Sequence, residues 1–127
     1  MFSEKSLLLK STEVTPFVGV VVDLPTFTTG WHYIETREDT SNAASVINIE
    51  QTVSGAELRL HEPTDQSAVK MIIVTNTGSQ SFLFKGHGAL SNSGGTIVAA
   101  GTGIIIMWTG VSVGYVLIAQ GTAVLTP

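Results

Sequence analysis

Short apolar runs rich in Ile, Val, Thr and aromatic residues recur along the second half of the chain, between clusters of Asn, Gly and Ser. Such runs are typical of short β-strands, and the polar clusters are typical of the turns that join them. Consecutive strands with short turns predict a β-meander over residues 69–119. The expected strands are residues 69–75, 81–85, 96–98, 103–109 and 113–119, with hairpin turns at 76–79 and 93–95.

The first half of the chain also contains runs with the pattern of strands. The expected strands are a β-branched run at residues 17–23 and alternating segments at 30–36, 45–50 and 56–62. The alternation is clearest in the last of these segments. Its apolar positions, Leu58 and Leu60, share one face, and its polar positions share the other face: Glu57, Arg59 and His61.

The chain lacks the apolar spacing of a long helix. Nowhere does a 3.6-residue period persist for three turns, and residues 63–68 have room for one helical turn. Roughly nine to ten short strands suit a sandwich or a barrel, so we predict an all-β fold, a β-sandwich or jelly-roll-like domain. Pro16 keeps the residue before it from being helical. It separates a predicted N-terminal arm, residues 1–15, from a single predicted β-domain, residues 16–127.

Charge is scarce and unevenly placed in this chain of 127 residues. Charged side chains make up 13% of the residues, about half of the ~25% typical of soluble domains. All ten carboxylates lie at or before Asp65, and no Asp, Glu, Lys or Arg follows Lys85. A surface this poor in charge is expected to be covered, most simply by other copies of the chain. The six basic residues are spread singly, so no binding of nucleic acid is expected.

Residues 110–114 match G-x-S-x-G, the nucleophile elbow of α/β hydrolases. The elbow requires a helix after the serine, and an acid and a histidine later in the chain. Residues 115–119 have the pattern of a strand, and no Asp, Glu or His follows Ser112. We therefore interpret residues 109–112 as a turn between two buried strands, and we predict no catalytic residues and no enzyme activity.

Residues 97–119 carry no charge over more than ~20 residues, about the length that spans a bilayer. Interpretation as a transmembrane helix competes with the strand prediction here. The segment contains four glycines and several Thr and Ser, and no Lys or Arg flanks it closely. Two buried strands explain the same residues better, so no membrane contact is predicted.

The three histidines, His32, His61 and His87, are scattered singly, without the spacing that sets two metal ligands on one element. Cysteine is absent, which removes thiolate zinc sites and disulfides. The glycine-containing turns lack the lysine that a phosphate-binding loop requires. We therefore predict no metal and no cofactor.

Three segments of the second half resemble a pattern that recurs in virion proteins of tailed bacteriophages. They are residues 74–79 (VTNTGS), 94–110 (GGTIVAAGTGIIIMWTG) and 115–118 (YVLI). In that pattern a strand ends in NTGS, a glycine-containing turn and an AG step lead into a second strand, and an aromatic strand closes the unit. Such modules occur in capsid decoration (cement) proteins, head fibres and tail fibres, commonly as trimeric β-sandwiches or jelly rolls.

The resemblance implies a virion structural protein, and it supplies no catalytic residues. Fibres are usually long chains, whereas this chain is filled by one predicted domain, so a decoration protein is favoured. Such a protein would be made in the host cytoplasm, bind the outer capsid surface of a phage head as a homotrimer, contact the major capsid protein and stabilise the head. An apolar terminal segment can add to a sheet edge of a partner, and the expected capsid-binding residues are Leu7, Leu8 and Leu9.

The alternative within the same family is a head-fibre or tail-fibre module that binds a receptor or a carbohydrate. Such a module needs exposed aromatic rings on which a sugar can stack. The candidates are Trp31, Tyr33 and Trp108, although packing in a core is the commoner use of such rings. A tail fibre would lie on the tail, whereas a head fibre would lie on the head, as a decoration protein does.

Overall fold

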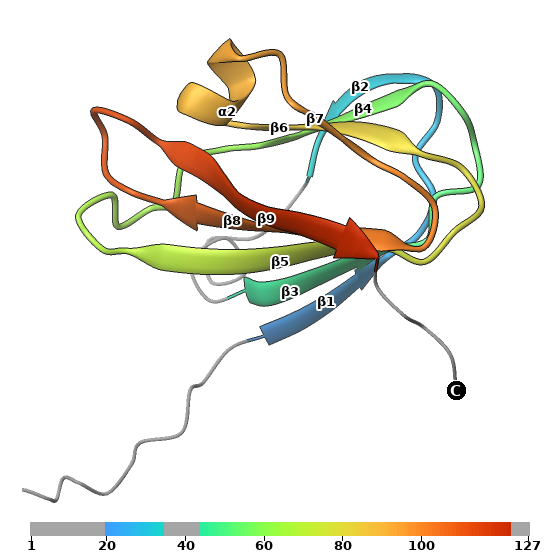
Figure 1. The fold of residues 1–127 in the computed structure, drawn as a ribbon, viewed down its shortest axis with the longest axis horizontal. Helices are drawn as coiled ribbons and strands as arrows, with labels where there is room; N and C mark the ends of the chain where they lie inside the picture. The colour runs from blue at the N-terminus through green and yellow to red at the C-terminus, as the bar shows by residue number, and fades with distance from the viewer. Residues whose placement is uncertain (1–19, 35–43, 123–127) are drawn as a thin grey trace, which may run out of the picture.

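The computed structural model of the protein describes residues 20–34 and 44–122, which form two β-sheets packed face to face (Figure 1). The first sheet has the strand order β1 (Val20–Leu24), β3 (Ala44–Ile49), β5 (Lys70–Asn76), β8 (Thr102–Trp108) and β9 (Tyr115–Thr122). The second has the order β2 (Gly30–Tyr33), β4 (Ala56–Leu60), β6 (Phe82–Gly86) and β7 (Thr96–Val98). A short helix, α2 (Ala89–Asn92), contacts β6 and β9. The prediction of an all-β fold with two packed sheets is confirmed, with nine strands in the described residues.

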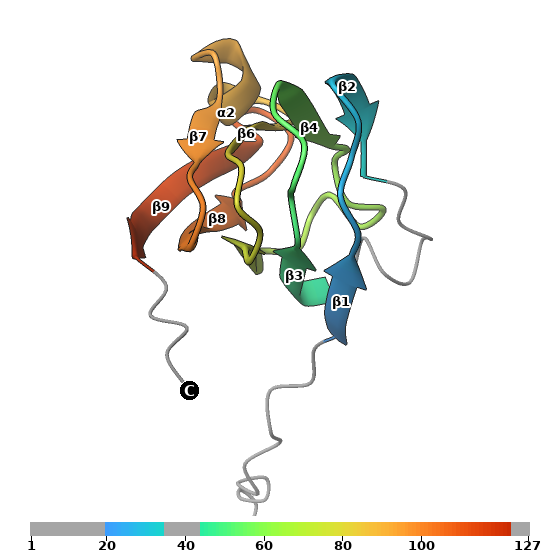
Figure 2. The same ribbon diagram turned by 90° about the vertical axis from the view of Figure 1, so that its right-hand side faces the viewer.

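The first six strands alternate between the two sheets, so that the chain winds around the core (Figure 2). Each of these strands pairs in parallel with the strand one turn of the winding away. In the first sheet β3 pairs with β1 and β5, and in the second sheet β4 pairs with β2 and β6. The winding repeats about every 26 residues, as the hydrogen bond from the Thr52 N–H to the Thr26 Oγ1 illustrates. Parallel pairing requires a long crossover connection, and the opposite sheet supplies it.

The last three strands reverse this pattern. β7 runs antiparallel to β6, β8 antiparallel to β5, and β9 antiparallel to β8. The strands expected at 103–109 and 113–119 do form a hairpin, as β8 and β9. The predicted meander is wrong, because β5 and β6 lie in different sheets, as do β7 and β8. Residues 76–79 therefore lead across to the other sheet and do not turn back as a hairpin.

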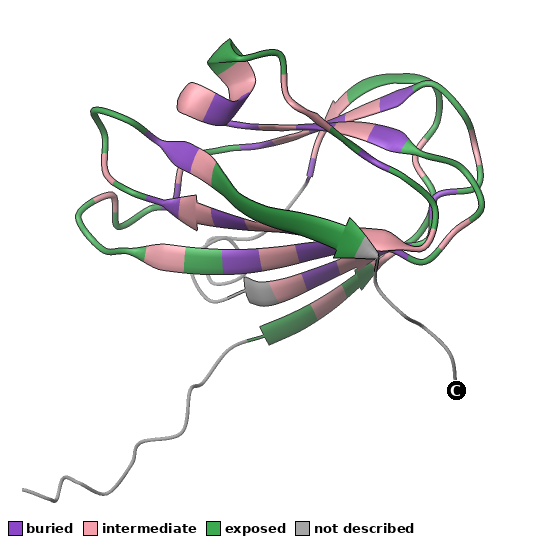
Figure 3. Ribbon diagram, viewed as in Figure 1, coloured by how far each residue is buried: buried purple, intermediate pink, exposed green. Residues whose placement is uncertain are grey.

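The inward-facing residues of both sheets form one apolar core. Along β4 and β6 every second residue is buried, as a period of two requires (Figure 3). The largest core side chains are Trp108 and Tyr115, whose rings meet edge to face with centroids 5.1 Å apart. The Trp108 indole N–H donates to the Gln66 carbonyl at 3.0 Å, and the Tyr115 hydroxyl donates to the His61 carbonyl at 3.2 Å. Burial raises the pKa of the Tyr115 hydroxyl, which therefore stays protonated as a donor.

Gln51 is a fully buried amide that ties together two connections between the sheets. Its Oε1 accepts a hydrogen bond from the Phe27 N–H at 2.9 Å. Its Nε2 donates to the carbonyls of Phe27 and Val53, each at 2.7 Å. The loop after β1 and the loop after β3 are therefore joined through one side chain, which satisfies main-chain groups that would otherwise be buried without partners.

Asn76 has the same role one turn of the winding later, and it too is fully buried. Its Nδ2 donates to the carbonyls of Gln80 at 2.7 Å and Val98 at 3.1 Å. Its Oδ1 accepts from the Gly78 N–H at 2.9 Å. The end of β5, the loop after it and the end of β7 are thus held by one amide.

Residues 63–68, which have room for one helical turn, do not form a helix. The Asp65 carboxylate accepts hydrogen bonds from the Ser67 N–H at 3.2 Å and the Ser67 hydroxyl at 2.7 Å. This side-chain bonding to nearby main chain favours a turn over a helix, and both bonds lower the pKa of Asp65.

Residues 97–119 lie mostly in strands β7, β8 and β9, which contradicts the competing interpretation as a membrane helix. In the part of the chain that the structure describes, no helix has the length and apolar character needed to cross a membrane. The predicted arm, residues 1–15, lies outside the described residues.

Candidate functional site

The outer face of the four-stranded sheet presents two rows of side chains across three parallel strands. Alternation along β2, β4 and β6 points one residue in two outward. The parallel register then sets these residues side by side. One row is Trp31, Glu57 and Leu83, and the next row is Tyr33, Arg59 and Lys85.

Trp31 and Tyr33 form the aromatic part of this face. Their rings meet edge to face with centroids 5.9 Å apart. The Arg59 guanidinium lies over the Trp31 ring, 4.3 Å from its centroid, and the Tyr33 ring stacks on His61 with centroids 3.8 Å apart. Trp31 still has 58% of its surface exposed. A large aromatic surface is therefore open to a ligand beside a cation.

Glu57 orients the two cations of this face. Its Oε2 accepts a hydrogen bond from the Arg59 Nε at 2.6 Å and lies 3.6 Å from the Lys85 Nζ. The hydrogen bond from Arg59 lowers the pKa of Glu57, and the charges of Arg59 and Lys85 add to that effect. Partly exposed ion pairs of this kind contribute little to stability. The main effect of the hydrogen bond to Glu57 is that it fixes the direction in which the Arg59 guanidinium points.

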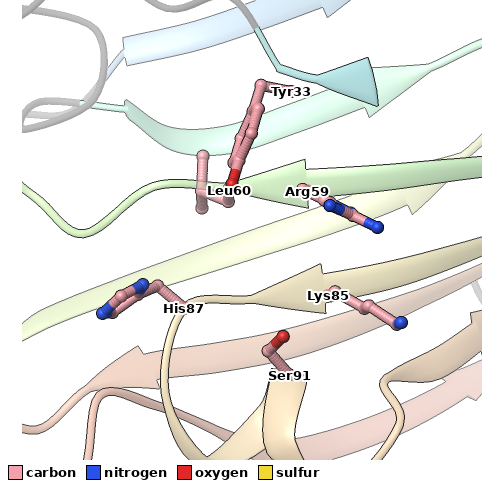
Figure 4. Close-up of a pocket in the computed structure, with 6 residues that line it drawn as sticks. All are labelled: Tyr33, Arg59, Leu60, Lys85, His87 and Ser91. Carbon is pink, nitrogen blue, oxygen red and sulfur yellow. The ribbon is translucent and has the colours of Figure 1, made fainter. Parts of the chain in front are cut away.

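A cleft of about 190 Å³ opens between these strands and α2 (Figure 4). The strands β2, β4 and β6 supply most of its lining, and α2 supplies one wall, from which the Ser91 hydroxyl points toward the strands. The residues that line the cleft are Tyr33, Arg59, Leu60, Lys85, His87 and Ser91. Most of these side chains carry hydrogen-bond donors, so the cleft suits a ligand rich in acceptors.

The outer face of the five-stranded sheet is different, because it is apolar along its middle. The register aligns one outward residue from each strand across the sheet. We call this set the aliphatic row: Val21, Val46, Ile73, Ile105 and Ala119. Met71 and Met107 pair beside it, and the exposed fractions of Val21 and Met71 are 63% and 48%.

A polar row borders the aliphatic row. The Asn48 Nδ2 donates to the Asp23 Oδ1 at 2.9 Å, and the Thr75 Oγ1 donates to the Asn48 Oδ1 at 2.6 Å. Gly103 and Gly121 continue this row without side chains, and a shallow depression of about 300 Å³ lies there. The depression gives the face a concave feature that a side chain of another molecule can fill.

The structure brings together two of the three aromatic residues predicted for carbohydrate binding. Trp31 and Tyr33 lie next to each other on one outer face. Trp108 is 1% exposed and belongs to the core of the other sheet, so its ring is not accessible to a sugar and its role is packing. The predicted capsid-binding residues Leu7, Leu8 and Leu9 lie outside the described residues.

The histidines and the G-x-S-x-G serine take separate places. His32 lies on β2, His61 follows β4, and His87 follows β6. Within residues 20–34 and 44–122, no three side chains of His, Cys, Asp or Glu are grouped so that they could hold a metal. Ser112 is exposed in the turn between β8 and β9, and a strand follows it where the nucleophile elbow has a helix.

Arg59 and Lys85 are the site residues that sequence reasoning did not bring together. The alternation of residues 56–62 predicts that Arg59 points outward, but it does not identify the neighbouring strands. The signal that could have found them is the repeat of about 26 residues, which places Tyr33, Arg59 and Lys85 at equivalent positions.

No protein-family model, curated protein or solved structure matches this chain. The two outer faces are therefore the structural observations from which a function can be proposed.

Proposed function

We propose that this protein is a structural protein of a phage virion, a homotrimer that binds the outside of the head and stabilises it. The observation that supports this most directly is the aliphatic row across the five-stranded sheet, which is exposed at its two ends, Val21 and Ala119, and half-buried between them. Monomeric soluble proteins rarely expose a large contiguous apolar patch, and such patches usually mark a contact with another molecule. The resemblance to virion modules suggests the kind of assembly.

The face that carries the aliphatic row is almost free of charge. Asp23 is the one charged side chain that points outward from the described strands of this sheet, and Asn48 already donates to it. Burying this face against another copy would therefore desolvate few charges. Removal of apolar surface from water contributes about 25 cal/mol per Å², which favours contact between copies through this face.

We favour a closed assembly of copies over an open one. Head-to-tail contacts that do not close into a ring produce filaments. A trimer also matches the local threefold axes of an icosahedral head, where three equivalent weak contacts with the major capsid protein combine into strong binding. A homotrimer is therefore the assembly that we favour.

Electron microscopy of virions that carry a labelled copy of this protein tests the proposed location. We expect the label on the outside of the head. Heads that lack the protein are expected to break at lower temperature or lower osmotic stress, because a ligand that binds only the assembled state stabilises that state. Label at the tail tips would contradict the decoration role and favour the fibre alternative.

Deletion of residues 2–15 tests the predicted arm. We expect the truncated chain to form the same oligomer but to bind capsids weakly, because the arm is proposed to add to a capsid sheet edge. Co-sedimentation with capsids measures the binding, and the full-length chain with Leu7, Leu8 and Leu9 replaced by serine provides a narrower comparison. Full decoration of capsids by the truncated chain would show that the arm is not the attachment.

Carbohydrate binding is the second candidate function. It is favoured by the exposed ring of Trp31 beside Tyr33 and by the cleft next to them. A fibre module would use such a face to bind a host receptor. Label at the tail tips would favour a tail fibre. Label on the head is expected both for a decoration protein and for a head fibre, and the stability of heads that lack the protein then distinguishes these two.

A further inference from the structure

The cleft between the four-stranded sheet and α2 contains donors that the fold leaves available. Arg59 uses its Nε for Glu57, and its terminal nitrogens have no hydrogen-bond partner among the described residues. The Lys85 Nζ is 3.6 Å from the same carboxylate, beyond the distance of a direct hydrogen bond. The hydroxyls of Tyr33 and Ser91 also make no hydrogen bond within the described part of the chain.

Cations are concentrated in this cleft. The described residues contain three Lys or Arg side chains, Arg59, Lys70 and Lys85, and two of them line the cleft. The whole chain has a net charge of -4, so this grouping is not a consequence of a basic composition. Glu57 is the carboxylate that contacts both cations, and Glu62 lies 3.8 Å from His87. The lining of the cleft therefore favours a ligand group that accepts hydrogen bonds and carries a negative charge.

The size of the cleft limits what it can hold. At about 190 Å³ it is smaller than the ~300–1,000 Å³ of a pocket for a drug-sized ligand. It has room for an anionic substituent, while the rest of the ligand must lie on the surrounding surface. The neighbouring surface is the exposed ring of Trp31, and such an aromatic ring offers an apolar surface for stacking.

We propose that this cleft binds an acidic saccharide, with the anionic group of the saccharide against Arg59 and Lys85 and a sugar ring against Trp31. The planar guanidinium of Arg59 and the ammonium of Lys85 donate to the anionic oxygens. The Tyr33 and Ser91 hydroxyls bind polar substituents of the sugar. The proposal rests on the second candidate function, carbohydrate binding. It is independent of the proposed structural role, because the site lies on the opposite outer face from the aliphatic row.

Isothermal titration calorimetry of the full chain tests the site with three probes. They are an oligogalacturonate, which carries carboxylates, a sulfated dextran oligomer and a neutral dextran oligomer. We expect at least one acidic probe to bind at least tenfold more tightly than the neutral probe. The acidic probe that binds more tightly identifies the anionic group as a carboxylate or a sulfate. Added salt is expected to weaken this binding, because it screens exposed charges.

Single substitutions then assign the binding to the cleft. Lys85→Gln and Arg59→Gln are each expected to weaken binding of the acidic probe about tenfold, because each removes hydrogen bonds between charged groups. Trp31→Ala is expected to weaken binding of acidic and neutral probes alike. Lys70→Gln is the matched control, since it removes the same charge outside the cleft, and it is expected to leave binding unchanged. Thermal unfolding of each variant verifies that the fold is retained.

Three results would overturn the proposal: no binding of either acidic probe, equal binding of neutral and acidic probes, or equal loss of binding in Lys85→Gln and Lys70→Gln. None of these results changes the mass of the assembly or its place on the virion. Failure of the saccharide site is therefore distinguishable from failure of the structural role.

Discussion

The Gly78→Ala variant is expected to be strongly destabilised, by about 3 kcal/mol or more in the free energy of unfolding. A Cβ atom at Gly78 would fall on the backbone carbonyl and amide nitrogen of Gln51. Both atoms belong to the main chain, so no side-chain rotation can relieve the clash. The loop after β5 would have to move away from the loop after β3.

That movement would break hydrogen bonds as well as packing. The Gly78 N–H donates to the Asn76 Oδ1 at 2.9 Å, and the Gln80 N–H donates to the Gln51 carbonyl at 2.9 Å. Gln51 and Asn76 are fully buried. A buried polar group that loses its partner costs about 1–3 kcal/mol. The expected effect therefore exceeds that of an ordinary surface substitution.

Urea unfolding followed by circular dichroism measures the change. Gly121→Ala is the matched control, because no atom lies within 4 Å of the Cβ that this substitution adds. We expect the control to stay within about 0.5 kcal/mol of the original chain. If both variants unfold at the same urea concentration, the loops after β3 and β5 are not packed as described.

The positions of the strands could be predicted because alternation is a local property of the sequence. The period of two in residues 56–60 points Leu58 inward and Arg59 outward, whatever strand lies beside them. Pairing between strands is not local. β4 pairs with β2 and β6, one turn of about 26 residues before and after it, while the intervening strands lie in the other sheet. The sequence of one strand does not state its neighbours, so a meander of consecutive strands was the wrong expectation.

For the candidate site as well, the residue types could be read from the sequence, but the pairing of strands that brings the residues together could not. Trp31 and Tyr33 could be named from residue type and spacing. Trp108 has the same type but lies on the inner face of its sheet, which depends on how the two sheets pack. Lys85 comes beside Arg59 only through the register of β4 and β6.

The sequence pattern also could not predict the short helix α2 or the burial of the Gln51 and Asn76 amides. α2 has 4 residues, too few to show a helical period. Gln51 and Asn76 stand in polar stretches that are typical of exposed turns. They are buried because the winding of the chain stacks one connection on the next, and the carbonyls and amides of those connections need partners.

The second large effect is expected at the centre of the aliphatic row. Ile73 lies between Val46 on β3 and Ile105 on β8. In the Ile73→Asp variant, each contact through this face would bury a carboxylate. We expect the binding free energy of each contact to fall by about 3 kcal/mol, which is a modest cost for an unpaired buried charge. This change would raise the dissociation constant by about 100-fold or more. Light scattering at micromolar concentration is expected to give a trimer mass for the original chain and a monomer mass for the variant.

Ile97→Asp is the matched control, because it makes the same substitution at a 54% exposed position on β7, in the four-stranded sheet. We expect this variant to keep the trimer mass. Circular dichroism should show both variants folded, since substitutions at such outward strand positions change stability by about 1 kcal/mol. A monomeric original chain would contradict the homotrimer, and a trimer that survives Ile73→Asp would place the contact on another face. Loss of the trimer in Ile73→Asp alone would identify the five-stranded sheet as the contact, because both variants lose the same side chain and gain the same charge.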